Sequence, residues 1–295
     1  MEHHVTVGVD GSPESRAAAR WAAREALLRR VPLRLVHAED LLLPPLAPSG
    51  DPEVRERWTD EVLTGAAEEL RRRHRQLDIV TRCLSGRPSA ALAAEAADAA
   101  LLVLGSRSLG RLVGFIIGSV SLSTLAATET PVVLVRTAGD PATDDPVVAE
   151  ARPAYGEIVV GVDVRQACDR VLAFAFEEAA RRDCTLRAVH GRKLPSVMGY
   201  VPVLDPDAPR EAERSAARML ADMLLPWRHK FPGVRVEEKT SIGSAGRELV
   251  QATAGADLVV VGRHVRRSPL GAHLGPVAHA VLHHAAAPVA VVAHD

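Results

Sequence analysis

Two short segments of the sequence combine small residues with polar side chains in a pattern that suits phosphate binding. One is Asp10-Gly11-Ser12, and the other lies between Gly105 and Ser121. Glycines let the backbone approach a ligand, and a glycine-serine pair can begin a helix whose free N–H groups and dipole attract an anion. Serine hydroxyls add donors, and arginines neutralise phosphate charge. The second segment contains Gly105, Ser106, Arg107, Ser108, Gly110, Arg111, Gly118, Ser119, Val120 and Ser121.

Asp10 is the acidic residue of the first segment, and it follows an apolar run that includes Gly8. A carboxylate is a poor neighbour for a triphosphate unless a metal ion or a hydroxyl lies between them. We therefore assign Asp10 to a ribose hydroxyl or, indirectly, to a magnesium ion. Taken alone, the glycine pattern also fits turns that only connect strands to helices.

The elements that position these segments follow from the hydrophobic pattern. Short apolar runs alternate with longer helical patterns, which predicts a mostly parallel sheet with helices on both faces. Ser12 can cap the first helix, and Pro13 suits its first turn. Ligands of such sheets bind beyond the carboxyl ends of the strands, where the strand order reverses. In the first half, strands are expected at residues 5–9, 33–38, 79–84, 101–104 and 132–135.

The chain repeats itself, which indicates two similar domains. Gly8-Val9-Asp10 and Val36-His37 recur 153 residues later as Gly161-Val162-Asp163 and Val189-His190. Gly86, Gly105 and Gly118 recur 157 residues later, in the second half. We expect one domain at 1–137, a linker rich in Pro, Asp and Ala at 138–155, and a second domain at 156–295.

The second half loses part of the phosphate-binding pattern. Val265 corresponds to Ser108, and Pro276 corresponds to Ser119, which removes a hydroxyl and an N–H donor. We expect the second site to be impaired or empty. Its remaining polar or small residues are Asp163, Gly262, Arg263, His264 and Gly275.

Composition excludes several classes of protein. With 47% hydrophobic and 25% charged residues, the 295-residue chain is typical of globular proteins. A net charge of -1 gives no broad attraction to nucleic acid or to a membrane surface. Three cysteines without C-x-x-C spacing, and the lack of a signal peptide or a long apolar run, favour a cytoplasmic protein.

Other motifs are absent or better explained by structure. The sequence contains no P-loop, no protein-kinase motif and no G-x-S-x-G elbow. His279 and His283 are four residues apart, with His284 adjacent and His273 upstream, which is a spacing that metal sites use. We interpret them instead as a partly exposed, histidine-bearing helix end.

In the setting of a duplicated five-strand domain, the sequence resembles the universal stress protein family. ATP-binding members carry G-x2-G-x9-G-[S/T] after the fourth strand, and Gly105, Ser108 and Gly118-Ser119 have this spacing, with serine as the second member. The run from Val7 to Ser12, the Gly86-Arg87-Pro88 turn and residues 131–135 are also similar to the family. The resemblance covers nearly all of both halves.

The resemblance implies an α/β fold with two tandem doubly wound, Rossmann-like domains, each with a five-stranded parallel sheet flanked by helices. It implies ATP, or else ADP or AMP, as ligand, together with a homodimer. Signalling by nucleotide binding further requires a regulatory protein partner or a second conformation, because binding shifts an equilibrium only by its difference in affinity between two states. The leading hypothesis is a nucleotide-dependent stress or dormancy regulator. The alternatives are a slow Mg-dependent ATP hydrolase, for which no general base is evident, and a scaffold that binds no nucleotide.

Overall fold

The structure, a computed structural model, describes residues 4–39, 52–106, 118–136, 156–166, 168–192, 208–265 and 274–295. These residues form two compact units, one within 4–136 and one within 156–295. The expected linker, 138–155, lies outside the described residues. Both units have an α/β fold, as predicted.

Unit 1 contains a parallel sheet whose strand order is β3-β2-β1-β4-β5. Its strands are β1 (Val5–Gly8), β2 (Leu33–Glu39), β3 (Ile79–Ser85), β4 (Leu101–Ser106) and β5 (Val132–Arg136). All five predicted strands of this half are confirmed, and their ends differ from the expected ends by at most two residues. The apolar runs identified these strands because a parallel sheet is buried on both faces.

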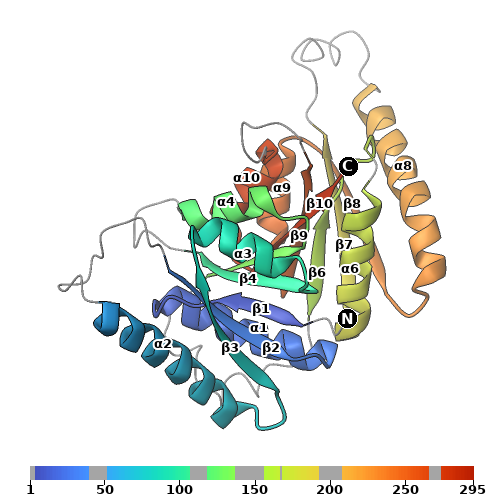
Figure 1. Ribbon diagram of the computed structural model, residues 1–295. Helices are drawn as coiled ribbons and strands as arrows, with labels where there is room; N and C mark the ends of the chain where they lie inside the picture. The colour runs from blue at the N-terminus through green and yellow to red at the C-terminus, as the bar shows by residue number, and fades with distance from the viewer. Residues whose placement is uncertain are drawn as a thin grey trace. The chain divides into compact units, whose positions relative to one another are not determined.

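Helices cover both faces of the unit 1 sheet. They are α1 (Pro13–Arg29), α2 (Pro52–Arg73), α3 (Pro88–Ala96) and α4 (Ser119–Ala127). The helices α1 and α2 lie on one face, and α3 and α4 lie on the other (Figure 1). This arrangement brings the N-termini of α1, α3 and α4 to the edge where the parallel strands end.

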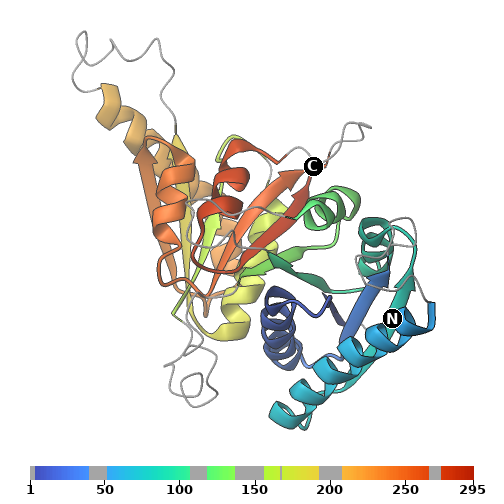
Figure 2. The same ribbon diagram turned by 90° about the vertical axis from the view of Figure 1, so that its left-hand side faces the viewer.

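Unit 2 repeats this plan with the strand order β8-β7-β6-β9-β10 (Figure 2). Its strands are β6 (Glu157–Gly161), β7 (Thr185–Arg192), β8 (Val236–Ile242), β9 (Leu258–His264) and β10 (Val289–His294). Its helices are α6 (Asp169–Arg182), α8 (Ala208–Lys230), α9 (Ala245–Ala252) and α10 (Pro276–His284). The structure therefore confirms two tandem domains of the predicted type.

The first helix begins as the sequence predicts. Ser12 caps α1, and its hydroxyl accepts a hydrogen bond of 3.1 Å from the backbone N–H of Ser15. The helix ends at Arg30, which adopts a left-handed conformation with φ 57°. Its sheet-facing side is made largely of alanines, so the helix can approach the strands closely. The buried alanines are Ala18, Ala19, Ala22, Ala23 and Ala26.

A buried ion pair recurs at the same place in both units. In α1, the Arg29 guanidinium donates to the Glu25 carboxylate at 2.6 Å. In α6, the carboxylate of Glu178 pairs with both Arg181 and Arg182. The side chains of Glu178 and Arg182 are only 1% and 3% exposed, so this ion pair is almost completely removed from solvent.

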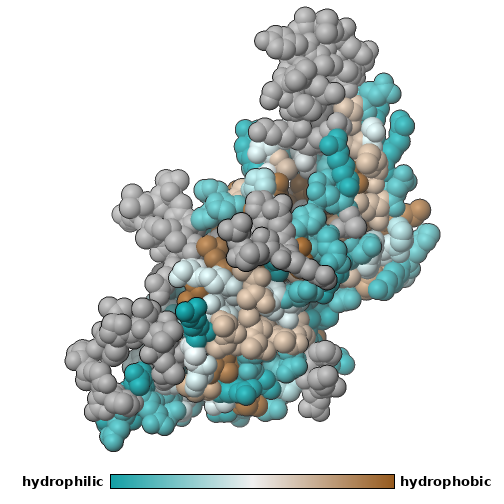
Figure 3. Space-filling view, turned by 45° about the horizontal axis from the view of Figure 1, so that its top comes forward, coloured by the Kyte–Doolittle hydropathy of each residue, from teal (hydrophilic) through white to brown (hydrophobic). Residues whose placement is uncertain are grey.

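Figure 3 shows hydrophilic residues over much of the visible surface, with apolar residues between them. Large exposed apolar side chains occur on α2, β3, α4 and α8 of the described chain. These residues are Val54, Trp58, Val80, Val120, Met219 and Leu225. Within the described ranges, no helix is both long and apolar enough to span a membrane.

Candidate functional site

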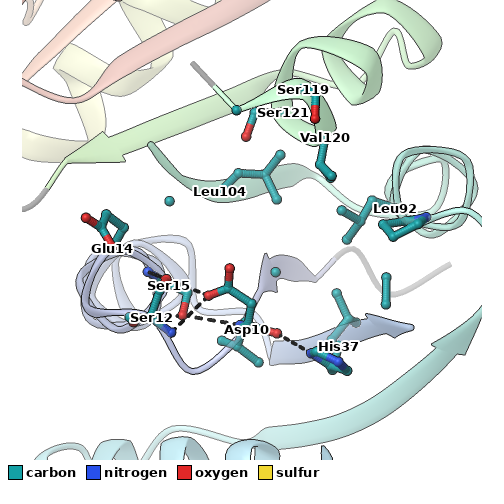
Figure 4. A pocket seen from close by; sticks show the side chains of 17 residues that line it. Asp10, Ser12, Glu14, Ser15, His37, Leu92, Leu104, Ser119, Val120 and Ser121 are labelled. Carbon is teal, nitrogen blue, oxygen red and sulfur yellow. Dashed lines mark hydrogen bonds between the residues drawn. The ribbon is translucent and has the colours of Figure 1, made fainter. Parts of the chain in front are cut away.

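A pocket of about 260 Å³ lies in unit 1 at the carboxyl ends of β1, β2 and β4. The strand order reverses between β1 and β4, so the pocket occupies the position predicted for a ligand. The N-termini of α1, α3 and α4 complete its wall (Figure 4). Eight residues predicted for the site line it. They are Gly8, Asp10, Ser12, Gly105, Gly118, Ser119, Val120 and Ser121.

The loop after β1 holds the carboxylate of Asp10 in place. Its Oδ1 accepts hydrogen bonds from the Ser12 N–H at 3.0 Å and from the Ser12 hydroxyl at 2.5 Å. The backbone N–H of Asp10 donates to the Ser15 hydroxyl at 3.2 Å. Figure 4 shows the carboxylate pointing into the pocket, across from Ser119. Asp10 is thus a fixed acceptor for a ligand hydroxyl or a hydrated cation.

The imidazole of His37 supports the same loop from β2. Its Nδ1 lies 2.7 Å from the carbonyl oxygen of Val9, and because a carbonyl only accepts, Nδ1 carries the proton. The Trp58 ring packs edge-on against the imidazole, with centroids 5.3 Å apart. Sequence reasoning did not assign His37 to the site, although its recurrence as His190 was a signal. His190 forms the same bond to Val162, at 3.0 Å.

The N-terminus of α4 opens onto the pocket without a side-chain cap. Gly118 occupies the cap position with φ -59° and ψ 148° and, as a glycine, it has no side chain to accept from the first turn. A Cβ placed on Gly118 would have no neighbour within 4 Å among the described residues. The first N–H groups and the helix dipole therefore face a space in which an anion can bind.

Other predicted glycines have structural roles. A Cβ on Gly105 would lie 2.7 Å from the backbone carbon of Glu14, so this glycine allows α1 to pack against β4. Gly11 and Gly86 have positive φ, 78° and 114°, which glycine adopts without strain. The described lining of the pocket does not include Gly11, Gly86 or Ser106. The Ser106 hydroxyl is buried and has no hydrogen-bond partner among the described residues.

Four predicted site residues, Arg107, Ser108, Gly110 and Arg111, lie outside the described residues.

The corresponding region of unit 2 keeps the hydrogen bond of the loop, and its β7 and α9 approach each other closely. The backbone N–H of Arg165 donates to Asp163 Oδ1 at 3.1 Å, as Ser12 does to Asp10 in unit 1. However, a Cβ on Gly191 would lie only 2.4 Å from Ala245 Cα. The sequence counterparts of Gly191 and Ala245, Ala38 and Pro88, both line the pocket of unit 1. The end of β7 and the start of α9 therefore meet where unit 1 has part of its cavity.

The remaining predicted residues of unit 2 make contacts of their own. His264 Nε2 lies 2.5 Å from Gln166 Oε1, and the His264 ring packs at a tilt of 49° against the His294 ring, with centroids 4.2 Å apart. Arg263 is only 4% exposed. Gly275 caps α10, but the next residue is Pro276, which has no N–H to offer an anion. A Cβ on Gly262 would meet the His294 ring at 2.7 Å.

The buried cysteines do not suit nucleophilic chemistry. Burial raises the pKa of the Cys168 thiol to about 11, and Asp169 and Asp163 add to the shift. Burial also raises the pKa of Cys184 to about 11. Both thiols are protonated at neutral pH, and the thiolate is the reactive form. Within the described ranges, no group of three or more His, Cys, Asp or Glu residues is arranged to hold a metal ion.

Comparisons with known proteins agree with this architecture. The model of the universal stress protein family matches residues 1–136 and 154–293. Universal stress protein Rv2005c of Mycobacterium tuberculosis is 35% identical over 297 residues, which cover 98% of this chain and 97% of that protein. The crystal structure of a universal stress protein from Archaeoglobus fulgidus DSM 4304 covers 100% of both chains with a TM-score of 0.71 and 16% identity.

A second Archaeoglobus fulgidus structure, a universal stress protein in complex with dAMP, covers 46% of this chain and 99% of its own. It is 26% identical, with a TM-score of 0.34.

Proposed function

Because the chain belongs to the universal stress protein family, we propose that unit 1 binds an adenine nucleotide, ATP foremost, and acts as a nucleotide-dependent stress regulator. The observation that carries this proposal is the joint placement of two features on one pocket. Asp10 presents a fixed carboxylate, and the uncapped N-terminus of α4 lies across from it. A nucleotide needs both, because its ribose offers hydroxyl donors and its phosphates need N–H donors.

The residues present fit such a ligand. Val36, Leu92 and Leu104 supply apolar lining suited to a base. Gly118 and Ser119 supply the helix N-terminus for phosphate, and we assign Asp10 to the ribose. When magnesium accompanies ATP, it neutralises phosphate charge, and Asp10 is the carboxylate that would hold its hydration shell. ADP and AMP share the base and ribose and would use the same pocket.

Regulation requires that the nucleotide bind two states of the protein with different affinity. We propose that occupancy of unit 1 favours one assembly, a homodimer, or one complex with a regulatory protein. In this proposal, unit 2 binds no nucleotide. The approach of Gly191 to Ala245 and the proline at the start of α10 support that difference.

Nucleotide carried by the purified chain tests the proposal directly. After denaturation, mass spectrometry of the released small molecules is expected to find about one adenine nucleotide per chain. Gly118→Ala is expected to lower this count, because a methyl group would lie beside the phosphate while meeting no atom of the described residues within 4 Å. Gly275→Ala is the matched control, since Gly275 caps α10 and its Cβ position is equally open.

Two nucleotides per chain would contradict the assignment of unit 2. If no nucleotide is found even after ATP is added and unbound ligand is removed, the scaffold hypothesis takes the place of the proposal.

A slow ATP hydrolase is the second candidate, and the Asp10 carboxylate in the pocket is the observation that favours it. Asp10→Asn keeps an oxygen that can accept from Ser12 but removes the charge. We expect ATP affinity to fall roughly tenfold both with and without magnesium, as for the loss of one charge-assisted hydrogen bond to the ribose. Calorimetric titration measures both values. A fall confined to the magnesium-containing titration, together with loss of ATP turnover, would favour the hydrolase.

A further inference from the structure

Two histidine side chains lie against each other on one side of α10. His279 and His283 are four positions apart in the sequence, and their ring centroids are 4.3 Å apart with an angle of 36° between the planes. His279 is exposed and His283 is half-buried. Residues four apart share one face of a helix, so both imidazoles can reach a common point outside it.

The histidine pair belongs to unit 2 alone. At the corresponding positions of α4, 157 residues earlier, unit 1 has Leu122 and Ala126. The sequence alone favoured a histidine-bearing helix end with no metal. The structure adds the contact between the two rings, which a helix end does not require.

We propose that His279 and His283 chelate one divalent transition-metal ion of the zinc, nickel and copper class. Imidazole is a preferred ligand of these ions, and water completes the coordination of a site with two protein ligands. Two nitrogens about 2.1 Å from one tetrahedral ion lie about 3.4 Å apart, which places the ring centroids about 5 Å apart. The observed centroid separation of 4.3 Å is within about 1 Å of this value.

The neighbouring histidine serves as an internal comparison. His284 follows His283 directly, and their ring centroids are 6.4 Å apart. Consecutive residues do not share a helix face, so His284 is not a ligand of the ion. Hard cations such as Mg²⁺ prefer oxygen ligands and do not bind this pair.

Bound metal would join two successive turns of α10. Pro276 begins this helix and His284 ends it, so the chelate spans much of its length. An ion that binds the folded chain better than the unfolded chain stabilises the fold by mass action. Zinc is therefore expected to raise the melting temperature of unit 2.

Zinc chloride titrated into the tag-free, nucleotide-free full chain tests the proposal by calorimetry. The wild type is expected to bind about one ion per chain. His279→Gln and His283→Gln are each expected to weaken binding at least tenfold, whereas His284→Gln leaves it unchanged. Equal affinity in all four proteins, or an equal loss in His284→Gln, would overturn the proposal.

Electron paramagnetic resonance with Cu²⁺ adds a spectroscopic signature that a merely structural role would not change. With one equivalent of Cu²⁺ per chain, the wild-type spectrum is expected to contain coupling to two imidazole nitrogens that is lost in His279→Gln and in His283→Gln but kept in His284→Gln. Because the sequence has 12 histidines, including His3 near the N-terminus, identical spectra in all four proteins would rule out chelation by the pair. Circular dichroism of each variant establishes that the helices remain folded.

Discussion

Aspartate in place of Gly118 is expected to weaken the proposed adenine-nucleotide binding strongly while leaving the fold at least as stable. Gly118 has φ -59° and ψ 148°, values that any residue adopts, and its Cβ position is open. An aspartate there would cap α4, which stabilises a helix by a few tenths of a kcal/mol relative to glycine. It would also place a negative charge at the proposed phosphate position. We expect affinity for ATP to fall roughly a hundredfold or more, about 3 kcal/mol.

The opposite signs of these two effects make the variant informative. Most substitutions that disrupt a site also destabilise the protein, so a loss of binding alone is ambiguous. Calorimetry with ATP and thermal unfolding without ligand separate the two effects. Gly275→Asp, at the cap of α10, is the matched control and should keep wild-type affinity. If Gly118→Asp still binds ATP normally, the phosphate does not lie at α4.

Removal of the Glu178 carboxylate is expected to destabilise unit 2 by about 3–5 kcal/mol. Glu178→Ala would remove the carboxylate that pairs with Arg182, whose side chain is 3% exposed. The cost comes from weaker compensation of a buried charge rather than from the strength of the pair itself. Urea unfolding followed by circular dichroism should show the transition of unit 2 at a lower urea concentration.

Glu248→Ala provides the comparison for this stability effect. Glu248 pairs with Lys239 at 3.4 Å, and the Lys239 side chain is 44% exposed. An exposed pair of this kind contributes at most about 1 kcal/mol. The double variant Glu178→Leu, Arg182→Met should recover part of the loss, because it removes both buried charges. Equal effects of Glu178→Ala and Glu248→Ala would contradict the role of burial.

Local pattern predicted the sheet well because burial on both faces leaves a continuous apolar run. The run at Val132–Arg136 is an example, with four successive buried residues in the strand. The cap of α1 was equally predictable, since Ser12 and Ser15 are neighbours in sequence. These features depend on interactions within a few residues, which a sequence displays directly.

Contacts between distant segments were harder to predict. Gly105 was predicted as a point of ligand approach, and it does line the pocket. The backbone of Glu14 would nevertheless meet a Cβ at this position, and that distance depends on how α1 packs against β4. The bond from His37 to Val9 likewise joins residues 28 apart. The approach of Gly191 to Ala245 in unit 2 also joins segments that are distant in sequence, so the glycine pattern did not predict it.

That approach has a consequence for how the protein would respond to a changing nucleotide concentration. Under the proposal that unit 1 alone binds nucleotide, which the approach of Gly191 to Ala245 supports, each chain has a single nucleotide site. The occupancy of a single site depends hyperbolically on the nucleotide concentration. A tenfold change in concentration around the midpoint therefore changes the occupancy only gradually. A steeper, sigmoidal response would have to come from coupling between chains, because cooperativity requires at least two interacting sites.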